Sequence, residues 1–344
     1  MFTGRSPEML ARISNRIFGY IRAALYIRRR FPHARVHPTA RIVGAERMML
    51  AEAAHVGRHT SLQIPHNASL FLGEGAWVGD DCDIAAGGTI VIGARTSIQH
   101  RSQLLGDVRI GAGCACAANL YVSSGRHAFD RVPALPIRLQ DHLASQTPWA
   151  ERSQAVVIGD DCWIGINVVV LPGITIGRGC VIGANSVVSK DLPPYSVAAG
   201  VPTRLLRMRL DFAPPASLDA SNDFHLPYFY AGFRQLSTWA SEDTAVPRQS
   251  GGLRASEQFT VALQIADGEP FSLQLDASTS GRIRHGDVMQ TLRSGRQTIH
   301  FNARPGRWKT LAFEWFSDQS SQSSALIVMS VCVEQEPHLV GAAP

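Results

Sequence analysis

The residue of this sequence best suited to proton transfer is His127, in the segment YVSSGRHAFD. Histidine titrates near neutral pH, so its ring accepts a proton from a hydroxyl group and returns it to a leaving group. The segment around His127 interrupts an otherwise regular sequence pattern. We therefore predict that His127 acts as a general acid and base in a cleft between copies of the chain. The alternative is a solvated loop histidine without a chemical role.

Other histidines compete with His127 for a functional role. His100 lies in the regular part of the sequence, and His142 lies in the same interruption as His127. His55 and His59 have the spacing of a metal-ligand pair, but they fall where the pattern is irregular. We expect no metal in the chemistry.

The elements that hold His127 follow from a period of six residues between Val156 and Lys190. A period of six fits neither an α-helix nor a single β-strand, but it fits a parallel β-solenoid with short strands and tight corners. We expect the aliphatic side chains to stack inside the coils, and the glycines to stand where the chain turns without a Cβ atom. The repeating positions are Ile158, Ile164, Val170, Ile176, Ile182 and Val188, with glycine at 159, 165, 177 and 183.

The period extends back to Val36 with small shifts, so residues 36–210 are predicted to form roughly seven coils of about 18 residues. It stops between residues 124 and 154, where prolines and charges gather. A stretch of this length is predicted to be a surface loop that leaves the solenoid, and such loops are usually functional or disordered.

Residues 1–35 hold eight arginines and one acidic residue, so this segment has a net charge of +7 and the rest of the chain has a net charge of −2. Apolar residues at helical spacing predict an amphipathic helix here. This helix either caps the open end of the solenoid or brings residues 1–30 to an anionic membrane surface. Basic residues are not spread over a face with aromatics, so we expect no nucleic-acid partner.

The cellular location is predicted from what the sequence lacks. No secretory signal and no apolar stretch of membrane-spanning length is evident. Five of the six cysteines, Cys82, Cys114, Cys116, Cys162 and Cys180, fall in the repeat region and are read as small buried thiols. We expect a cytoplasmic protein, with peripheral contact at the inner face of the cell membrane as a further hypothesis.

The C-terminal third has a different sequence pattern, without the period of six. Residues 211–223 are rich in proline, serine and aspartate, which predicts a linker. In residues 224–344, apolar and polar side chains alternate with a period of two, which predicts an antiparallel β-sandwich of jelly-roll type. Tyr228, Tyr230, Phe233 and Trp239 are either part of its core or a surface on which sugars stack.

The run IGDDCWIGINVVVLPGITIGRGCVIGANSVVSKDLPPYSVAAGVPTRLLR resembles the hexapeptide-repeat acyltransferases, which fold as a left-handed parallel β-helix. The similarity is greatest to the acetyltransferases of galactosides, maltose and xenobiotics and to the O-acetyltransferases of bacterial surface polysaccharides. It covers residues 36–208, and the loop NLYVSSGRHAFDRVPALPIRLQ is similar to that of the polysaccharide branch. The resemblance implies a homotrimer that uses acetyl-CoA.

The resemblance also implies roles for individual residues. His127 matches the catalytic base, and Asn119 matches an asparagine that faces the acceptor. The acid that orients the histidine in some members cannot be assigned, because Asp130 is too close in sequence. The positions that match the binding site for acetyl-CoA are Trp163, Gly165, Ile166, Ala184, Ser189, Lys190, Arg204 and Arg207. The family often has a small polar residue where Ile166 stands, so this position departs from the family pattern.

The expected function is transfer of acetyl from acetyl-CoA to a sugar hydroxyl, in the synthesis of bacterial surface polysaccharide or lipopolysaccharide. One alternative is an amino-sugar N-acyltransferase on the same scaffold, and another is a non-catalytic carbohydrate-binding trimer. A carbonic anhydrase of the same fold needs a histidine five residues after His127, where Val132 stands.

Overall fold

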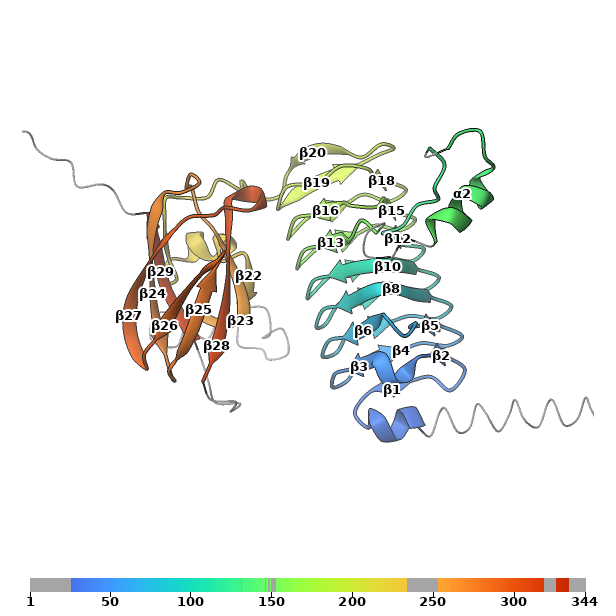
Figure 1. The fold of residues 1–344 in the computed structure, drawn as a ribbon, viewed down its shortest axis with the longest axis horizontal. Helices are drawn as coiled ribbons and strands as arrows, with labels where there is room; N and C mark the ends of the chain where they lie inside the picture. The colour runs from blue at the N-terminus through green and yellow to red at the C-terminus, as the bar shows by residue number, and fades with distance from the viewer. Residues whose placement is uncertain are drawn as a thin grey trace, which may run out of the picture. The chain divides into compact units, whose positions relative to one another are not determined.

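The computed structural model describes residues 26–130, 132–145, 147, 149, 153–233, 253–318 and 326–333. The chain divides into two compact units, Met1–Asp211 and Phe212–Pro344. The first is a solenoid of parallel strands and the second is antiparallel (Figure 1). The predicted fold class, a left-handed parallel β-helix with a separate antiparallel sheet domain, is confirmed.

Most of the predicted N-terminal helix lies outside the described residues, and of it residues 26–30 are seen to be helical. Within the described part, no helix is long and apolar enough to span a bilayer.

The β-helix has three faces, each made of short strands that pair in parallel with the strand of the next coil (Figure 1). The first face consists of β1 (Arg35–Val36), β4 (His55–Val56), β7 (Trp77–Val78), β9 (Ser97–Ile98), β11 (Ala115–Cys116), β14 (Trp163–Ile164), β17 (Val181–Ile182) and β19 (Ser196–Ala199), closed by the antiparallel β20 (Arg204–Met208).

The second and third faces share two long strands, β8 (Asp83–Ile92) and β10 (Gln103–Ile110), whose first halves lie in the second face and whose second halves lie in the third. The other strands of the second face are β2 (Arg41–Val43), β5 (Ser61–Gln63), β12 (Tyr121–Ser123), β15 (Val169–Val170) and β18 (Val187–Val188). The other strands of the third face are β3 (Met48–Leu50), β6 (Ser69–Leu72), β13 (Val156–Ile158) and β16 (Thr175–Ile176), and the short helix η1 (Ala45–Arg47) precedes β3.

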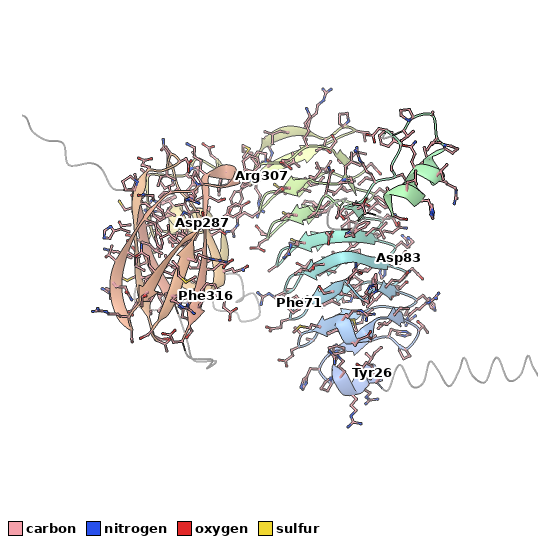
Figure 2. All side chains as sticks on the ribbon, in the orientation of Figure 1. Tyr26, Phe71, Asp83, Asp287, Arg307 and Phe316 are labelled. Atoms are coloured by element: carbon pink, nitrogen blue, oxygen red, sulfur yellow. The ribbon has the colours of Figure 1, made fainter. Side chains whose placement is uncertain are left out.

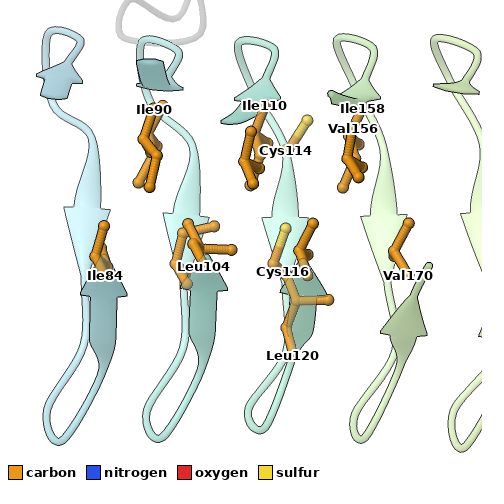
Figure 3. Packing of buried hydrophobic residues seen from close by; sticks show 14 of the residues in the cluster. Ile84, Ile90, Leu104, Ile110, Cys114, Cys116, Leu120, Val156, Ile158 and Val170 are labelled. Atoms are coloured by element: carbon orange, nitrogen blue, oxygen red, sulfur yellow. The ribbon is translucent and has the colours of Figure 1, made fainter. Parts of the chain in front are cut away.

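The core of the β-helix is a set of aliphatic columns. The six positions predicted from the period are each exposed by 1% or less, and pairing keeps them in register from coil to coil, as for Ile164 and Ile182. Figure 3 shows the same stacking in earlier coils, including Ile84, Leu104 and Cys116. Burial of each such side chain contributes about 1.5–3 kcal/mol, so the repeat itself stabilises the fold.

The glycines of the repeat were predicted to allow tight turns, but in the structure they allow close approach of the next coil. Their φ angles are not left-handed, but the next coil passes very close to them. A Cβ atom on Gly165 would lie 2.6 Å from the backbone nitrogen of Ala184, and one on Gly159 would lie 2.5 Å from that of Arg178. The left-handed conformation falls instead on residues such as Asn167, with a φ of 59°. These glycines therefore permit close stacking of coils.

The five cysteines of the β-helix are buried and free, as predicted. Four of them point at a backbone carbonyl of the next coil; for example, the Cys114 Sγ atom lies 3.1 Å from the oxygen of Gly159. Burial raises the pKa of Cys116 and Cys162, which keeps these thiols protonated. They act as small packing groups.

The second unit is one antiparallel sheet in the order β26-β25-β28-β23-β29-β24-β27. Its strands are β23 (Leu253–Ala262), β24 (Pro270–Ala277), β25 (Gly281–His285), β26 (Val288–Leu292), β27 (Gly295–Asn302), β28 (Thr310–Ser317) and β29 (Leu326–Val333), with η4 (Arg307–Lys309) before β28. Strands β21 (Ser217–Asp219) and β22 (Ala231–Phe233) pair with β29 and β23, and η2 (Asp223–Tyr228) lies between them.

This sheet folds over its own core. His285 of β25 contacts Phe301 of β27 with ring centroids 5.7 Å apart, although these strands lie near opposite ends of the strand order. Phe271 and Phe313 also meet across the core, 6.0 Å apart. The two halves of the sheet therefore face each other, as in a sandwich.

Two sequence predictions need adjustment at the start of this unit. The expected linker, residues 211–223, contributes strand β21, whose Leu218 is buried in the core. Of the aromatics considered as a sugar surface, Tyr228 packs against the core and Tyr230 lies against Phe212. Trp239 lies outside the described residues.

Candidate active site

The predicted loop leaves the β-helix between β12 and β13 and closes on itself at its base. The backbone nitrogen of Gln154 donates to the carbonyl of Ser124 at 2.8 Å, and the hydroxyls of Ser124 and Ser153 are 2.8 Å apart. Ser124 is buried. The parallel stack continues directly beyond the base, because Gly173 donates to Gln154 at 2.9 Å. The loop therefore projects from one corner without breaking the solenoid.

Trp149 anchors the returning arm of the loop to the β-helix. Its indole Nε1 donates to Asp107 Oδ2 at 2.6 Å, and Asp107 Oδ1 accepts from the backbone of Thr89 at 2.7 Å. The ring lies against glycines: a Cβ atom on Gly87 would be 2.3 Å from it and one on Gly106 would be 2.7 Å away. The absence of side chains on these two glycines, which lie on neighbouring coils, therefore leaves the space that the indole ring occupies.

The loop contains helix α2 (Ile137–Ala144), which is held by a buried glutamine. The Gln140 amide donates to the carbonyl of Leu135 at 2.9 Å and of Phe129 at 3.3 Å, and its oxygen accepts from the backbone of Val132 at 3.1 Å. A buried amide with these partners fixes the chain before the helix. Gln140 therefore sets the position of α2 relative to the segment that carries His127.

His127 and Asp141 form a hydrogen-bonded pair across the loop. The His127 Nδ1 atom is 2.6 Å from Asp141 Oδ2, and the backbone nitrogen of Ala128 donates to Asp141 Oδ1 at 2.7 Å. Both carboxylate oxygens are engaged, so the carboxylate has a fixed orientation. An ionised carboxylate only accepts, and therefore the neutral imidazole places its proton on Nδ1 and leaves the Nε2 lone pair available as a base.

The exposure of the pair favours reaction with an external substrate. The His127 side chain is 82% exposed, whereas that of Asp141 is 32% exposed. The less exposed carboxylate holds the more exposed ring toward solvent, which is the arrangement of a base and its orienting acid. Asp130, the acid nearest in sequence, forms an ion pair with Arg126 at 3.5 Å instead.

Asn119 lies at a corner of the β-helix, with a φ of 60°. Its amide nitrogen donates to Asn167 Oδ1 at 2.7 Å, and Asn167 donates in turn to Asn185 at 2.8 Å. Its own oxygen accepts from Arg101 at 3.0 Å. These contacts form an asparagine ladder along three coils and give Asn119 a clear structural role. Its predicted contact with the acceptor stays a prediction.

Four of the predicted cofactor residues surround this same corner. Trp163 is 60% exposed on the first face, and Ile166 is 42% exposed beside Asn167. Gly165 and Ala184 are stacked neighbours in successive coils, since Gly165 could not carry a Cβ atom without meeting Ala184. Together they present an apolar surface with backbone groups nearby, which suits an acyl chain with amide links.

The remaining predicted cofactor residues lie elsewhere. Ser189 and Lys190 follow β18 at the corner from which the loop of His127 projects two coils away, and Lys190 is exposed. Arg204 and Arg207 are exposed on β20, at the end of the first face. Within one chain the predicted residues therefore occupy two corners and the last strand, and do not form a single cluster.

Sequence reasoning missed three residues that shape the site. Asp141 orients His127, Gln140 holds α2, and Trp149 anchors the loop. Gln140 and Asp141 directly follow the Ile-Arg-Leu run at 137–139. The position of Asp141 in the sequence does not by itself show this role, because only the fold of α2 brings residue 141 back to residue 127.

The competing histidines have other surroundings. His55 stacks on Trp77 with ring centroids 5.8 Å apart, and Trp77 meets His100 edge-on at 5.5 Å. His100 Nδ1 accepts from the backbone of Asp80 at 2.9 Å, and burial lowers the pKa of His55. His59 faces Asp81 at 3.5 Å. In the described part of the chain, no three histidine, cysteine or acidic side chains gather as a metal site.

The sequence of this chain is similar to a family of bacterial transferases and to individual acetyltransferases. Residues 155–190 match the family model described as bacterial transferase hexapeptide (six repeats). A putative colanic acid biosynthesis acetyltransferase of Escherichia coli strain K12 is 34% identical over 151 residues, which are 44% of this chain and 65% of that protein. A probable macrolide acetyltransferase of Lysinibacillus sphaericus is 35% identical over 120 residues, covering 33% of this chain and 67% of that protein.

A solved structure is also similar. It is a hexapeptide-repeat acetyltransferase of Vibrio cholerae in complex with acetyl coenzyme A, with 25% identity, a TM-score of 0.32, and coverage of 61% of this chain and 94% of that one. The matched region spans 65% of the length of the Escherichia coli relative and 67% of the length of the Lysinibacillus sphaericus relative.

Proposed function

Because the chain belongs to the bacterial hexapeptide-repeat acetyltransferases, we propose that it transfers acetyl from acetyl-CoA to a hydroxyl group of a sugar. The observation that carries the proposal is the 2.6 Å contact between His127 Nδ1 and Asp141, which leaves an exposed Nε2 atom as a base. Family membership supplies the class of reaction, and this pair supplies the group that would move the proton.

The proposed mechanism is a direct transfer. His127 Nε2 removes the proton of the acceptor hydroxyl as its oxygen attacks the thioester carbon. A backbone N–H group at a coil corner stabilises the negative oxygen of the tetrahedral intermediate. When the carbon–sulfur bond breaks, the imidazolium returns its proton to the leaving thiolate, so the ring ends each cycle neutral. Asp141 keeps the ring oriented and stabilises the positive charge that it carries in between.

The donor is proposed to bind along the predicted residues. Trp163, Ile166 and Ala184 offer an exposed apolar corner for the pantetheine arm, while Arg204 and Arg207 on β20 would hold the nucleotide phosphates. Ser189 and Lys190 lie at the corner that also carries the loop of His127. Since these places are separate within one chain, a homotrimer in which two copies share each site agrees with the geometry.

The acceptor is proposed to be a carbohydrate of bacterial surface polysaccharide or lipopolysaccharide. The Escherichia coli relative is named for colanic acid biosynthesis, whereas the other relative is named for macrolides, so the acceptor is the least constrained part of the proposal. We propose that the protein works in the cytoplasm. Contact of the arginine-rich residues 1–30 with the inner face of the membrane would bring it to a lipid-linked acceptor.

The test is to incubate the full chain with acetyl-CoA and a panel of sugar acceptors, and to follow release of free thiol together with the mass of the product. An acetyl ester that is cleaved by mild base, and that is not formed by His127→Ala, supports the proposal. A base-stable amide would identify an amino-sugar N-acyltransferase instead. No binding of acetyl-CoA by the folded trimer would indicate a non-catalytic carbohydrate-binding protein.

A further inference from the structure

The outer face of β25, β26 and β28 carries an unusual combination of side chains for a solvent-exposed sheet. Arg282 and Arg284 of β25 both point outward, and pairing places Arg282 opposite Phe316 and Arg284 opposite Glu314. On the other side, Arg282 lies opposite Thr291 of β26. We call this exposed surface the β25 face, and it combines two arginines, a phenylalanine, a carboxylate and a hydroxyl.

Phe316 is the first notable member of the β25 face. Its side chain is 40% exposed, and Figure 2 shows it at the surface of the second unit. The other aromatic side chains described on strands β23 to β28 are core residues, all exposed by 6% or less: Phe259, Phe271, Phe301, Phe313 and Trp315. The exposed Phe316 ring therefore offers an apolar surface on which a ligand could stack.

The arginines are the second notable feature. Arg284 forms an ion pair with Glu314, and its guanidinium carbon lies 5.9 Å from the centre of the Phe316 ring. Gln258 of β23 donates to the other oxygen of Glu314 at 3.4 Å. These contacts hold Arg284 and Phe316 side by side. Arg282 is also exposed, and it is the residue of β25 that pairs with Phe316.

We propose that the β25 face binds a carboxylate-bearing polysaccharide. The apolar face of a sugar ring would stack on Phe316, and a uronate carboxylate would be held by the fork of Arg282. Thr291, Gln258 and Glu314 offer a hydroxyl, an amide and a carboxylate as partners for sugar hydroxyls. The surface lies on the second unit, so it would collect acidic polymer separately from the transfer of acetyl.

The composition of the β25 face favours such a glycan over other polyanions. A nucleic acid or an anionic membrane needs several cations that act together, because each contact neutralises one phosphate. Here one of the two arginines is already paired with Glu314, and that carboxylate would repel a dense row of phosphates. A polymer with one carboxylate among many hydroxyls matches a single available arginine beside polar groups.

The experiment measures binding of the full chain to polygalacturonate, with dextran as the neutral polymer, by affinity electrophoresis. We expect retardation by polygalacturonate that weakens as salt is raised, and none by dextran. Phe316→Ala and Arg282→Gln should each weaken binding by about tenfold or more, with unchanged circular dichroism. The matched control is Arg296→Gln, which removes an exposed arginine from the outer side of β27 and should change binding by less than about twofold.

Each other result overturns the proposal. Equal losses in Arg282→Gln and Arg296→Gln would mean general charge attraction, and no retardation would mean no glycan site. Tighter binding to DNA or to anionic vesicles, lost in the same variants, would assign the β25 face to another partner. Acetylation of a small sugar should be unaffected in Phe316→Ala and Arg282→Gln, so that failure of this site and failure of the proposed enzyme activity are told apart.

Discussion

The Nδ1 atom of His127 lies 2.6 Å from a carboxylate oxygen of Asp141, although the two residues are 14 positions apart in the sequence. The contact depends on helix α2, which turns the loop back on itself. The second oxygen of Asp141 is held by the backbone of Ala128. The loop that interrupts the repeat therefore contains both His127, the proposed base, and Asp141, the proposed orienting acid.

Replacement of His127 by alanine should lower the rate of acetyl transfer by about 10²–10⁴-fold, because the acceptor hydroxyl then loses its base. The measurement is steady-state thiol release with acetyl-CoA and the best sugar acceptor. His142→Ala is the matched control, since this histidine is exposed on helix α2 of the same loop, where its backbone carbonyl accepts from the Ser145 hydroxyl at 2.7 Å. Unchanged turnover in His127→Ala, with normal assembly, would contradict the assignment.

Replacement of Asp141 by asparagine should lower kcat by about tenfold or more while the KM for acetyl-CoA stays close to that of the wild type. The amide keeps the shape of the carboxylate, but it stabilises the wrong tautomer of His127 and does not balance the imidazolium charge. Asp130→Asn serves as control, since Asp130 pairs with Arg126 and not with His127. An equal loss in both variants would point to the loop as a whole, and not to this pair.

Removal of the Trp149 indole should release the returning arm of the loop and so reduce activity without unfolding the β-helix. Gly87→Ala should have the same effect, because its Cβ atom would lie 2.3 Å from the indole ring. Limited proteolysis should cut both variants faster within residues 124–154, and activity should fall in proportion. Leu139→Ala, which shortens an exposed side chain on α2, should leave both properties unchanged. Full activity in Gly87→Ala would argue against this anchor.

The double variant Arg204→Gln with Arg207→Gln should raise the KM for acetyl-CoA by about tenfold, since each lost guanidinium removes a charge-assisted contact with phosphate. Acetyl-pantetheine, which lacks the nucleotide, should be used equally well by the variant and the wild type. Arg109→Gln removes an exposed arginine from the third face and provides the control. Equal effects on both donors would remove these arginines from the proposed phosphate site.

The stability of the second unit should decrease in mildly acidic solution because of His285. The ring is buried, its Nδ1 donates to Ala312 at 2.8 Å, and its Nε2 accepts from the backbone of Arg304 at 3.1 Å. A proton on Nε2 would break the second contact, and burial lowers the pKa of His285 below the ordinary value of 6.5. The unfolded chain therefore binds a proton that the folded chain does not, and stability falls as pH drops below about 6.5.

Between pH 7.5 and 5.5 this residue should lower the free energy of unfolding of the second unit, because the unfolded chain takes up a proton that the folded chain does not. Hydrogen exchange of the β25 and β28 amides at the two pH values measures it, after correction for the intrinsic rates. His285→Gln should lose this dependence, and His300→Gln, exposed on β27, should keep it. The same pH response in His285→Gln would exclude the mechanism.

The sequence determined the solenoid because its signal is local and repeated. One aliphatic residue in every six, from Ile158 to Val188, specifies a buried column without knowledge of any distant contact. The alternation of apolar and polar residues in β24 and β28 likewise specifies a sheet with one buried side. His127 could be singled out because it stands where the repeat fails.

The tertiary structure decided what surrounds that histidine. Asp141 reaches His127 only because α2 folds back. Trp149 can bond to Asp107 only because Gly87 and Gly106, on neighbouring coils, leave room for its ring. The tertiary structure also shows that part of the predicted linker forms strand β21. This strand pairs with β29, and its Leu218 is buried. A repeat can be recognised from residues close together in the sequence. A hydrogen bond between a loop and a coil depends instead on how the whole loop closes in space, and no local sequence pattern specifies that closure.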